Sequence, residues 1–132
     1  TVTVTNGDTT ECIVTNVDSP ASPTGTTVQS WILKDTMTLT GIRAGAADAD
    51  EAVVDFYLYS DATCETPVGS DLDNAVESGS AATDVGVAVS DPGTYYWIAD
   101  YSGDAYNLDH QTVCGDEITV IQAQDEDNIL PE

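Results

Sequence analysis

The chain has 132 residues, of which 24 are acidic and only two, Lys34 and Arg43, are basic, so its formal net charge is −22. DNA and RNA need a cationic face on their partner, and two basic residues cannot make one. Anionic membrane surfaces are excluded as partners for the same reason. No apolar run approaches the roughly 20 residues of a membrane-spanning helix, so membrane insertion is not expected. A hydrophobic content of 41% is enough for the packed core of one ordinary domain.

This acidity has two interpretations. An acidic surface repels itself at low ionic strength, and salt relieves the repulsion beyond a Debye length of about 10 Å. The protein therefore works in high salt, or its clustered carboxylates hold divalent cations. The single lysine, together with abundant Asp, Thr, Ala and Val, favours the first interpretation.

The N-terminal residues predict a strand pair followed by a boundary. Residues 1–5 alternate strictly between Thr and Val, and Asn6-Gly7 is a strong hairpin signal. Residues 12–17 are the expected returning strand, so residues 1–18 form a strand pair or the end of an upstream module. Residues 19–25, rich in Pro and Ser, are the expected linker. Because the chain opens in a strand pattern without Met, we expect a piece of a longer protein.

From residue 26 onward, turn residues recur about every 8 to 12 positions, which is the spacing of an all-β sandwich. No stretch has a helical period. We expect the sandwich to occupy residues 26–123, with an acidic tail at 124–132. Loops are expected at 41–51 and 61–73. The expected strand segments are 28–40 (in two pieces), 52–59, 75–83 (a weak edge), 85–89, 94–101 (between turns at 91–93 and 102–104) and 117–121.

Residues 93–104 are the densest aromatic stretch of the chain. Tyr95, Trp97 and Tyr101 share one face at strand period, and Tyr96 lies on the other. Residues 91–97 have the pattern Asp-x-Gly-x-Tyr-x-Trp. It resembles the start of strand F of an immunoglobulin-like sandwich, where a tyrosine hydroxyl folds back on the preceding turn. Tyr95 would be that tyrosine, and we predict that Trp97 is among the most buried residues.

Several motifs in order resemble the immunoglobulin-like repeats of large secreted and surface-anchored prokaryotic proteins, over residues 28–121. The motifs that carry this resemblance are 34–41 (KDTMTLTG), 56–64 (FYLYSDATC), 66–68 (TPV), 92–97 (PGTYYW), 101–104 (YSGD) and 114–117 (CGDE). Residues 4–16 (VTNGDTTECIVTN) separately resemble the closing strands of a collagen-adhesin-type repeat.

This resemblance implies a Greek-key sandwich of about seven strands with an N-terminal strand extension. It also implies an extracellular location, at the cell surface or secreted, and a spacing or mechanical role without catalysis. In such repeats cysteines at the positions of Cys64 and Cys114 pair, and closing that loop would stabilise the domain by about 4 kcal/mol. Cys12 is then the odd thiol, either free or paired with another chain or with a segment upstream.

The N-terminal strand pair suggests a way of assembling. Val2, Val4, Ile13 and Val14 give it an apolar edge, so it could add a strand to a neighbouring copy. The alternative is that it packs on its own domain or on an upstream module. The expected partners are therefore other copies of the chain or neighbouring modules of the same surface protein.

Two weaker candidates concern ligands. Asp48, Asp50 and Glu51 are the first choice for a calcium ion, although no acidic cluster has the spacing of a known calcium loop and a solvated loop explains them as well. No cofactor is otherwise required. A second set of residues could form an aromatic platform for a sugar, although cross-strand packing is the commoner role of such residues. This set is Tyr96, Tyr101 and Tyr106, with His110 near them.

The leading interpretation is thus a non-catalytic structural module of an extracellular surface protein or filament, acidic and salt-tolerant. The alternative is a carbohydrate- or calcium-binding module of an adhesin or secreted enzyme. The chain contains one histidine, no Gly-x-Ser-x-Gly motif and no glycine-rich phosphate loop, so we do not expect an enzyme.

Overall fold

The computed structural model describes residues 6–7, 13–16, 18–43 and 51–123. These residues form nine β-strands and no α-helix, so the all-β prediction is confirmed. No helix in this part of the chain could cross a membrane. The strands are β1 (Trp31–Leu33), β2 (Thr36–Thr38), β3 (Val53–Tyr59), β4 (Pro67–Ala75), β5 (Ser80–Ala82), β6 (Val87–Val89), β7 (Gly93–Tyr101), β8 (His110–Gln111) and β9 (Glu117–Ile121).

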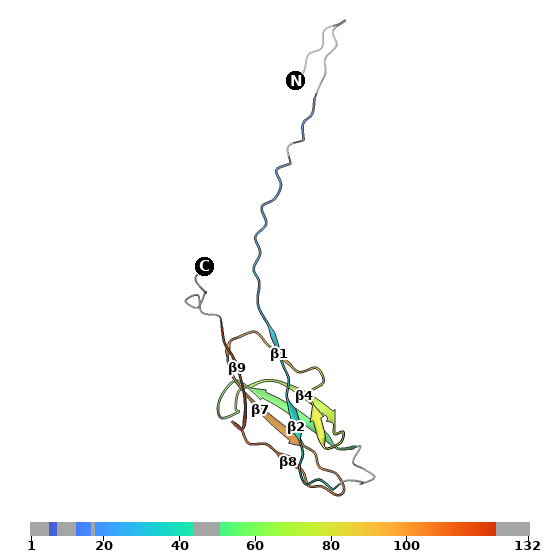
Figure 1. Cartoon of the computed structure of the whole chain (residues 1–132). Helices are drawn as coiled ribbons and strands as arrows, with labels where there is room; N and C mark the ends of the chain where they lie inside the picture. Colours follow the sequence, from blue (N-terminus) through green and yellow to red (C-terminus); the bar gives the residue numbers. More distant parts are fainter. Residues whose placement is uncertain (1–5, 8–12, 17, 44–50, 124–132) are drawn as a thin grey trace, which may run out of the picture.

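The strands form one large antiparallel sheet and two small antiparallel pairs (Figure 1). The large sheet has the order β4-β3-β7, and β8 and β9 both pair with the remaining edge of β7. The small pairs are β1 with β6 and β2 with β5. Buried residues of all three sheets make one hydrophobic core, as in a sandwich of two layers.

Strands β3 and β7 supply the centre of the core because their apolar residues alternate. Val54, Phe56 and Leu58 are fully buried on one face of β3. The β3–β7 register sets Leu58 opposite Trp97, and the rings of Phe56 and Trp97 meet edge to face at 6.3 Å. Trp97 is only 1% exposed, which confirms the prediction made from the sequence.

The second layer is one long ladder interrupted in the middle. Lys34 and Asp35 separate β1 from β2, and a turn containing Gly86 separates β5 from β6. Gly86 has φ of +81°, and a Cβ there would lie 2.6 Å from the backbone oxygen of Leu33. The buried carboxylate of Asp71 accepts a hydrogen bond of 2.6 Å from the Gly86 N–H. Glycine is required here because only it fits this backbone and this close contact.

The expected loop at 61–73 is wrong in its second half, because β4 begins at Pro67 and pairs with β3. Pro67, Gly69 and Asp73 made this segment look like a turn. The pairing with β3 outweighs that local preference, and the strand accommodates it with register shifts and with φ of +60° at Asp73. Pro67 is tolerated because β4 is the edge strand of the large sheet.

The chain before β1 runs away from the sandwich (Figure 1). Residues 18–30 belong to no strand and are exposed throughout, with Val28 82% exposed. Residues 13–16 are likewise exposed and outside any strand, so the expected returning strand at 12–17 is not present in its described part. The sandwich starts at Trp31 rather than at residue 26.

Candidate binding groove

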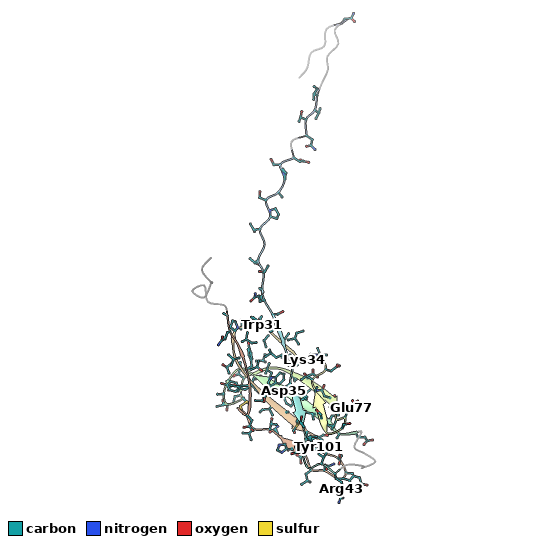
Figure 2. All side chains as sticks on the ribbon, viewed as in Figure 1. Trp31, Lys34, Asp35, Arg43, Glu77 and Tyr101 are labelled. Atoms are coloured by element: carbon teal, nitrogen blue, oxygen red, sulfur yellow. A yellow bond between two sulfur atoms is a disulfide. The ribbon has the colours of Figure 1, made fainter. Side chains whose placement is uncertain are left out.

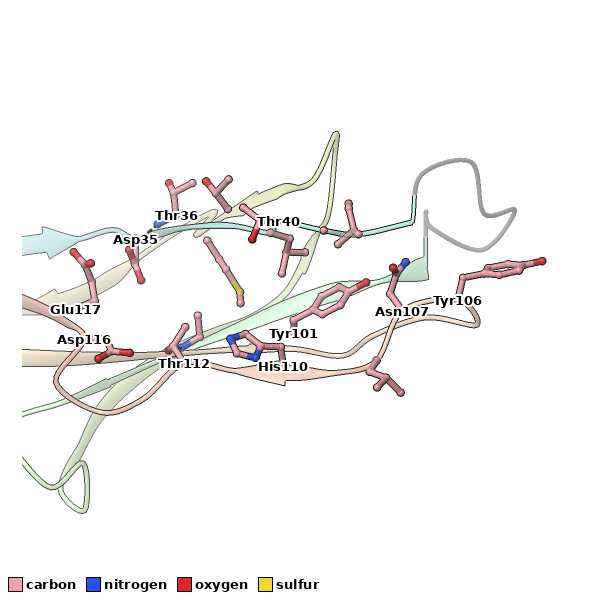
Figure 3. A pocket seen from close by; sticks show the side chains of 17 residues that line it. Asp35, Thr36, Thr40, Tyr101, Tyr106, Asn107, His110, Thr112, Asp116 and Glu117 are labelled. Atoms are coloured by element: carbon pink, nitrogen blue, oxygen red, sulfur yellow. Dashed lines mark hydrogen bonds between the residues drawn. The ribbon is translucent and has the colours of Figure 1, made fainter.

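An open groove of about 660 Å³ runs along one side of the sandwich (Figure 3). One wall is the segment from Asp35 to Ile42, which includes β2. The opposite wall is β8 with the chain leading into β9, including Thr112 and Glu117. Its floor is the end of β7, where Ala99 and Tyr101 lie. The groove therefore runs between the outermost strands of the two layers.

The wall at β2 carries an unpaired strand edge. Among the described strands, β2 pairs with β5, where Leu39 N–H donates to the Gly79 oxygen (2.8 Å) and the Asp35 oxygen accepts from Thr83 N–H (3.0 Å). Hydrogen-bonding groups of successive strand residues point to opposite edges. The intervening residues Thr36 and Thr38 therefore direct their backbone groups to the edge that faces away from β5. Thr36 N–H donates there to the carboxylate of Asp35 at 2.8 Å.

The far wall is held to β7 by backbone and side-chain bonds. Thr112 donates its N–H to the Ala99 oxygen, and its hydroxyl accepts from the Ala99 N–H, both at 2.9 Å. At the end of the groove, Asn107 accepts a 2.7 Å hydrogen bond from the N–H of Arg43. That bond joins the two walls at this end, so the groove is bounded by ordered chain on three sides.

Asp104 orders the loop at this end. Its carboxylate accepts hydrogen bonds from the side chain and backbone N–H of Asn107 and from the backbone N–H of Tyr106. The Asn107 side chain is the largest cause, followed by the Tyr106 N–H, of an Asp104 pKa below its ordinary value. This carboxylate is thus used to hold the loop, together with the Tyr101 hydroxyl that donates to it at 3.3 Å.

The other end of the groove is acidic. Asp35, Asp116 and Glu117 all line it, and Figure 3 shows Asp35 and Glu117 near one another across the groove. Burial raises the pKa of Asp35 above its ordinary value, the Thr36 N–H works against this shift, and the charge of Glu117 adds to it. The groove therefore favours neutral groups over further acidic ones.

The tyrosine platform predicted from the sequence is not formed. Tyr101 is only 3% exposed and lies on the core face of β7, whereas Tyr96 lies on the opposite face of the same strand. The two are five positions apart, and an odd separation in a strand places side chains on opposite faces. Tyr106 is exposed on the loop after β7. Tyr101, Tyr106 and His110 line the groove, and Tyr96 does not.

A different set of tyrosines shares the outer face of the large sheet. Tyr59 lies opposite Tyr96 in the β3–β7 register, and Tyr57 lies opposite Ile98. All are partly exposed. Tyr57 and Tyr59 were not among the binding residues predicted from the sequence, although their alternation with Phe56 and Leu58 indicates the face away from the core.

The metal candidates are spread between described and undescribed parts of the chain. Asp48 and Asp50 lie outside the described residues, and Glu51 is exposed. Among the residues that the structure describes, no three His, Cys, Asp or Glu side chains are grouped as metal ligands. The carboxylates of Asp71 and Asp104, elsewhere in the sandwich, accept hydrogen bonds from the chain itself.

Two of the three cysteines are paired, as the family resemblance implied. Cys64 and Cys114 form a disulfide that joins the loop after β3 to the turn before β9. A disulfide is typical of proteins that fold in an oxidising environment. Cys12 lies outside the described residues, as do Val2 and Val4 of the strand-exchange candidates. Ile13 and Val14, the other two, are 77% and 87% exposed.

Lys34 and Arg43, the two basic residues, lie far apart on the surface (Figure 2). Lys34 donates a 3.0 Å hydrogen bond to the backbone oxygen of Asp84. This bond joins the segment between β1 and β2 to the turn after β5. Figure 2 shows Arg43 at the end of the sandwich away from Trp31. The two cations therefore form no shared anion site.

Comparison with protein-family models, with curated proteins and with solved structures found no match to this chain.

Proposed function

We propose that this chain is a non-catalytic structural module of an extracellular surface protein or filament, and that it assembles by giving its N-terminal segment to a neighbouring copy. The proposal rests on two features that occur together in the structure. Residues 18–30 lead away from the sandwich and are exposed along their whole length, while one edge of β2 has no partner among the strands that the structure describes. A free strand edge and a free extended segment are the two components of strand addition.

The sandwich is of the immunoglobulin-like Greek-key type in this proposal. Two features support that. The buried Tyr95 donates its hydroxyl to the backbone oxygen of Asp91, four residues earlier, at 2.5 Å, as a corner tyrosine does. Strands β3 and β7 are central in one sheet while the intervening β5 and β6 pair in the other layer. In a complete sandwich of this type one more strand precedes β1. Among the residues that the structure describes, no strand occupies that position.

An extracellular location fits both the disulfide and the charge. The disulfide needs an oxidising compartment. A net charge of −22 keeps copies apart in dilute buffer, so assembly belongs to a salty environment, where screening is strong.

The test is the size of the full chain in solution. We expect the mass measured by light scattering in about 1 M NaCl, where the Debye length is roughly 3 Å, to rise with protein concentration, and electron microscopy to show elongated species. A Cys12→Ser variant, which removes any bond between chains through that thiol, should associate in the same way. A chain that stays monomeric at every concentration would contradict the proposal.

A second candidate is carbohydrate binding on the outer face of the large sheet. Tyr57, Tyr59 and Tyr96 are partly exposed there, and aromatic rings on a flat face suit sugar rings. Binding to a glycan array that is lost in a Tyr59→Ala variant with unchanged folding would support this function. Equal signals for the variant and the parent chain would remove it.

A further inference from the structure

We propose that the groove between β2 and β8 is the acceptor site of this assembly, and that residues 13–18 of a second copy fill it as a strand added to the open edge of β2. The inference rests on the proposed function, which requires an acceptor but does not say where on the sandwich it lies.

The acceptor is defined by backbone groups of β2 and the residues after it that have no partner within the described part of the chain. Thr38 and Thr40 alternate with Met37 and Leu39, whose ladder faces β5, so their N–H and C=O groups point into the groove. An extended chain laid alongside would satisfy these groups with the geometry of an ordinary sheet. Thr36 N–H already bonds to Asp35, so pairing begins beyond that residue.

The groove also offers an apolar floor for alternate side chains of the added strand. Ala99 and Tyr101 of β7 lie at its base, and Leu39 and Ile42 on its wall are only partly covered. A strand that pairs with β2 points every second side chain toward this floor. Burying apolar groups there extends the core of the sandwich by one strand.

Residues 13–18 have the required pattern. Their sequence alternates between Ile13, Thr15 and Val17 on one face and Val14, Asn16 and Asp18 on the other. The first face is uncharged and β-branched, which suits both strand geometry and a groove that carries several carboxylates. The second face is mainly polar and suits solvent. Ile13 and Val14 are both highly exposed in the single chain, so both are accessible to a second copy.

The occupant comes from a second copy because the chain's own adjacent residues are unsuited to the site. A reversal just before Trp31 would lay the spacer at 19–25 beside β2, and that spacer contains Pro20 and Pro23. Proline has no N–H to donate. The two prolines are an odd number of positions apart, so in any register one of them faces β2 and breaks the ladder.

The spacer has the length to reach a neighbour. Residues 19–30 are twelve residues of extended chain, and at roughly 3.3 Å per residue they span about 40 Å. The donor residues therefore lie well clear of their own groove, as Figure 1 shows for the chain before β1. Each copy gives a strand at one end and receives one on its side, so the contact is head-to-tail and can repeat into a filament.

The experiment uses full-length chains with one matched pair of substitutions on each partner. On the donor, Ile13→Asp places a charge on the inward face, and Val14→Asp places the same charge on the outward face. On the acceptor, Thr38→Pro removes an N–H that points into the groove, and Thr38→Val keeps it. We expect Ile13→Asp and Thr38→Pro to weaken association at least about tenfold, with little change for the two controls.

Mixing the two defective chains is the decisive arm. The Ile13→Asp chain keeps its groove and the Thr38→Pro chain keeps its donor, so each alone should be monomeric and the mixture should form a one-to-one dimer that grows no further. Near-ultraviolet circular dichroism of each variant verifies that the fold is retained.

The other outcomes separate the two proposals. If the parent chain associates and Thr38→Pro associates equally well, strand exchange stands but this groove is not the acceptor. If Val14→Asp is as damaging as Ile13→Asp, or the mixture stays monomeric, the assigned donor face is wrong. If the parent chain never associates, the proposed function fails and this inference falls with it.

Discussion

Tyr95 shows how a single side chain ties the central strand to the turn before it. Its ring is buried in the core, and its hydroxyl donates to the Asp91 oxygen at 2.5 Å. We predict that Tyr95→Phe keeps the packing but leaves that oxygen without its partner, which destabilises the fold by about 1 kcal/mol and lowers the melting temperature by about 5 °C. Tyr96→Phe, on the opposite face of β7, is the matched control. Equal melting temperatures for the two variants would contradict the role given to Tyr95.

Asp61 organises the loop that carries Cys64. Its carboxylate accepts from the Thr63 hydroxyl at 2.5 Å and from the Thr66 N–H at 2.7 Å, and these bonds, the first being the larger cause, lower its pKa to about 2. A carboxyl pKa depressed by folding stabilises the fold above the ordinary pKa of 3.8, and the benefit is lost as the pH falls toward 2.

We therefore predict that Asp61→Asn is less stable than the parent chain at neutral pH and that this difference shrinks as the pH falls from about 4 and is lost below about 2. Residue-resolved NMR titration should place the midpoint of Asp61 near 2, well below that of an exposed aspartate. A midpoint near 4 would mean that these hydrogen bonds do not persist in solution.

At this scale the sequence predicted buried positions well and surface positions poorly. The alternation in β3 and β7 identified Val54, Phe56 and Trp97 as core residues, since a period of two is read directly from the residues. The grouping of Tyr96 with Tyr101 failed because closeness along the chain was given more weight than the parity of their positions. The groove residues His110 and Asp35 could not be brought together at all, because their proximity depends on how the two layers pack.

The disulfide links two parts of the fold that are distant in sequence. It joins the loop after β3 to the turn before β9 across 50 positions of sequence. We predict that replacing both Cys64 and Cys114 by Ser costs about 4 kcal/mol in the free energy of unfolding, because the unfolded chain regains the freedom of that loop. Chemical denaturation followed by tryptophan fluorescence measures this, with Cys12→Ser as the control. A loss below about 1 kcal/mol would show that the loop is already closed in the unfolded state.

The sequence predicted a strand correctly where its own residues alternate between buried and exposed. It did not predict a strand that forms only because a neighbouring strand pairs with it. Strand β9 was predicted with the bounds that the structure has, and β3 and β7 were predicted to within one residue. Strand β4 was predicted as a loop because its Pro67, Gly69 and Asp73 oppose a strand locally, and only its pairing with β3 overrides them. The two-residue β8 has too little pattern to detect.

The whole molecule is dominated by its charge. With 24 acidic and two basic residues, repulsion opposes both folding and association. We predict that raising NaCl from about 0.1 to 1 M, which shortens the Debye length from about 10 to 3 Å, raises the melting temperature. A calcium salt at equal ionic strength should give a similar rise. A large stabilisation by calcium at micromolar concentration would instead support a specific cation site in the acidic loops.

In the proposed assembly, the open edge of β2 becomes a paired edge when copies associate. Hydrogen exchange of the Thr38 and Thr40 amides measures this most directly, comparing the parent chain with Ile13→Asp at the same concentration in about 1 M NaCl. Leu39, whose N–H already bonds to Gly79 at 2.8 Å, is the internal control and should be protected in both. We expect Thr38 and Thr40 to be protected only in the associating parent chain. Equally fast exchange of these two amides in both samples, while the parent chain associates, would contradict the account.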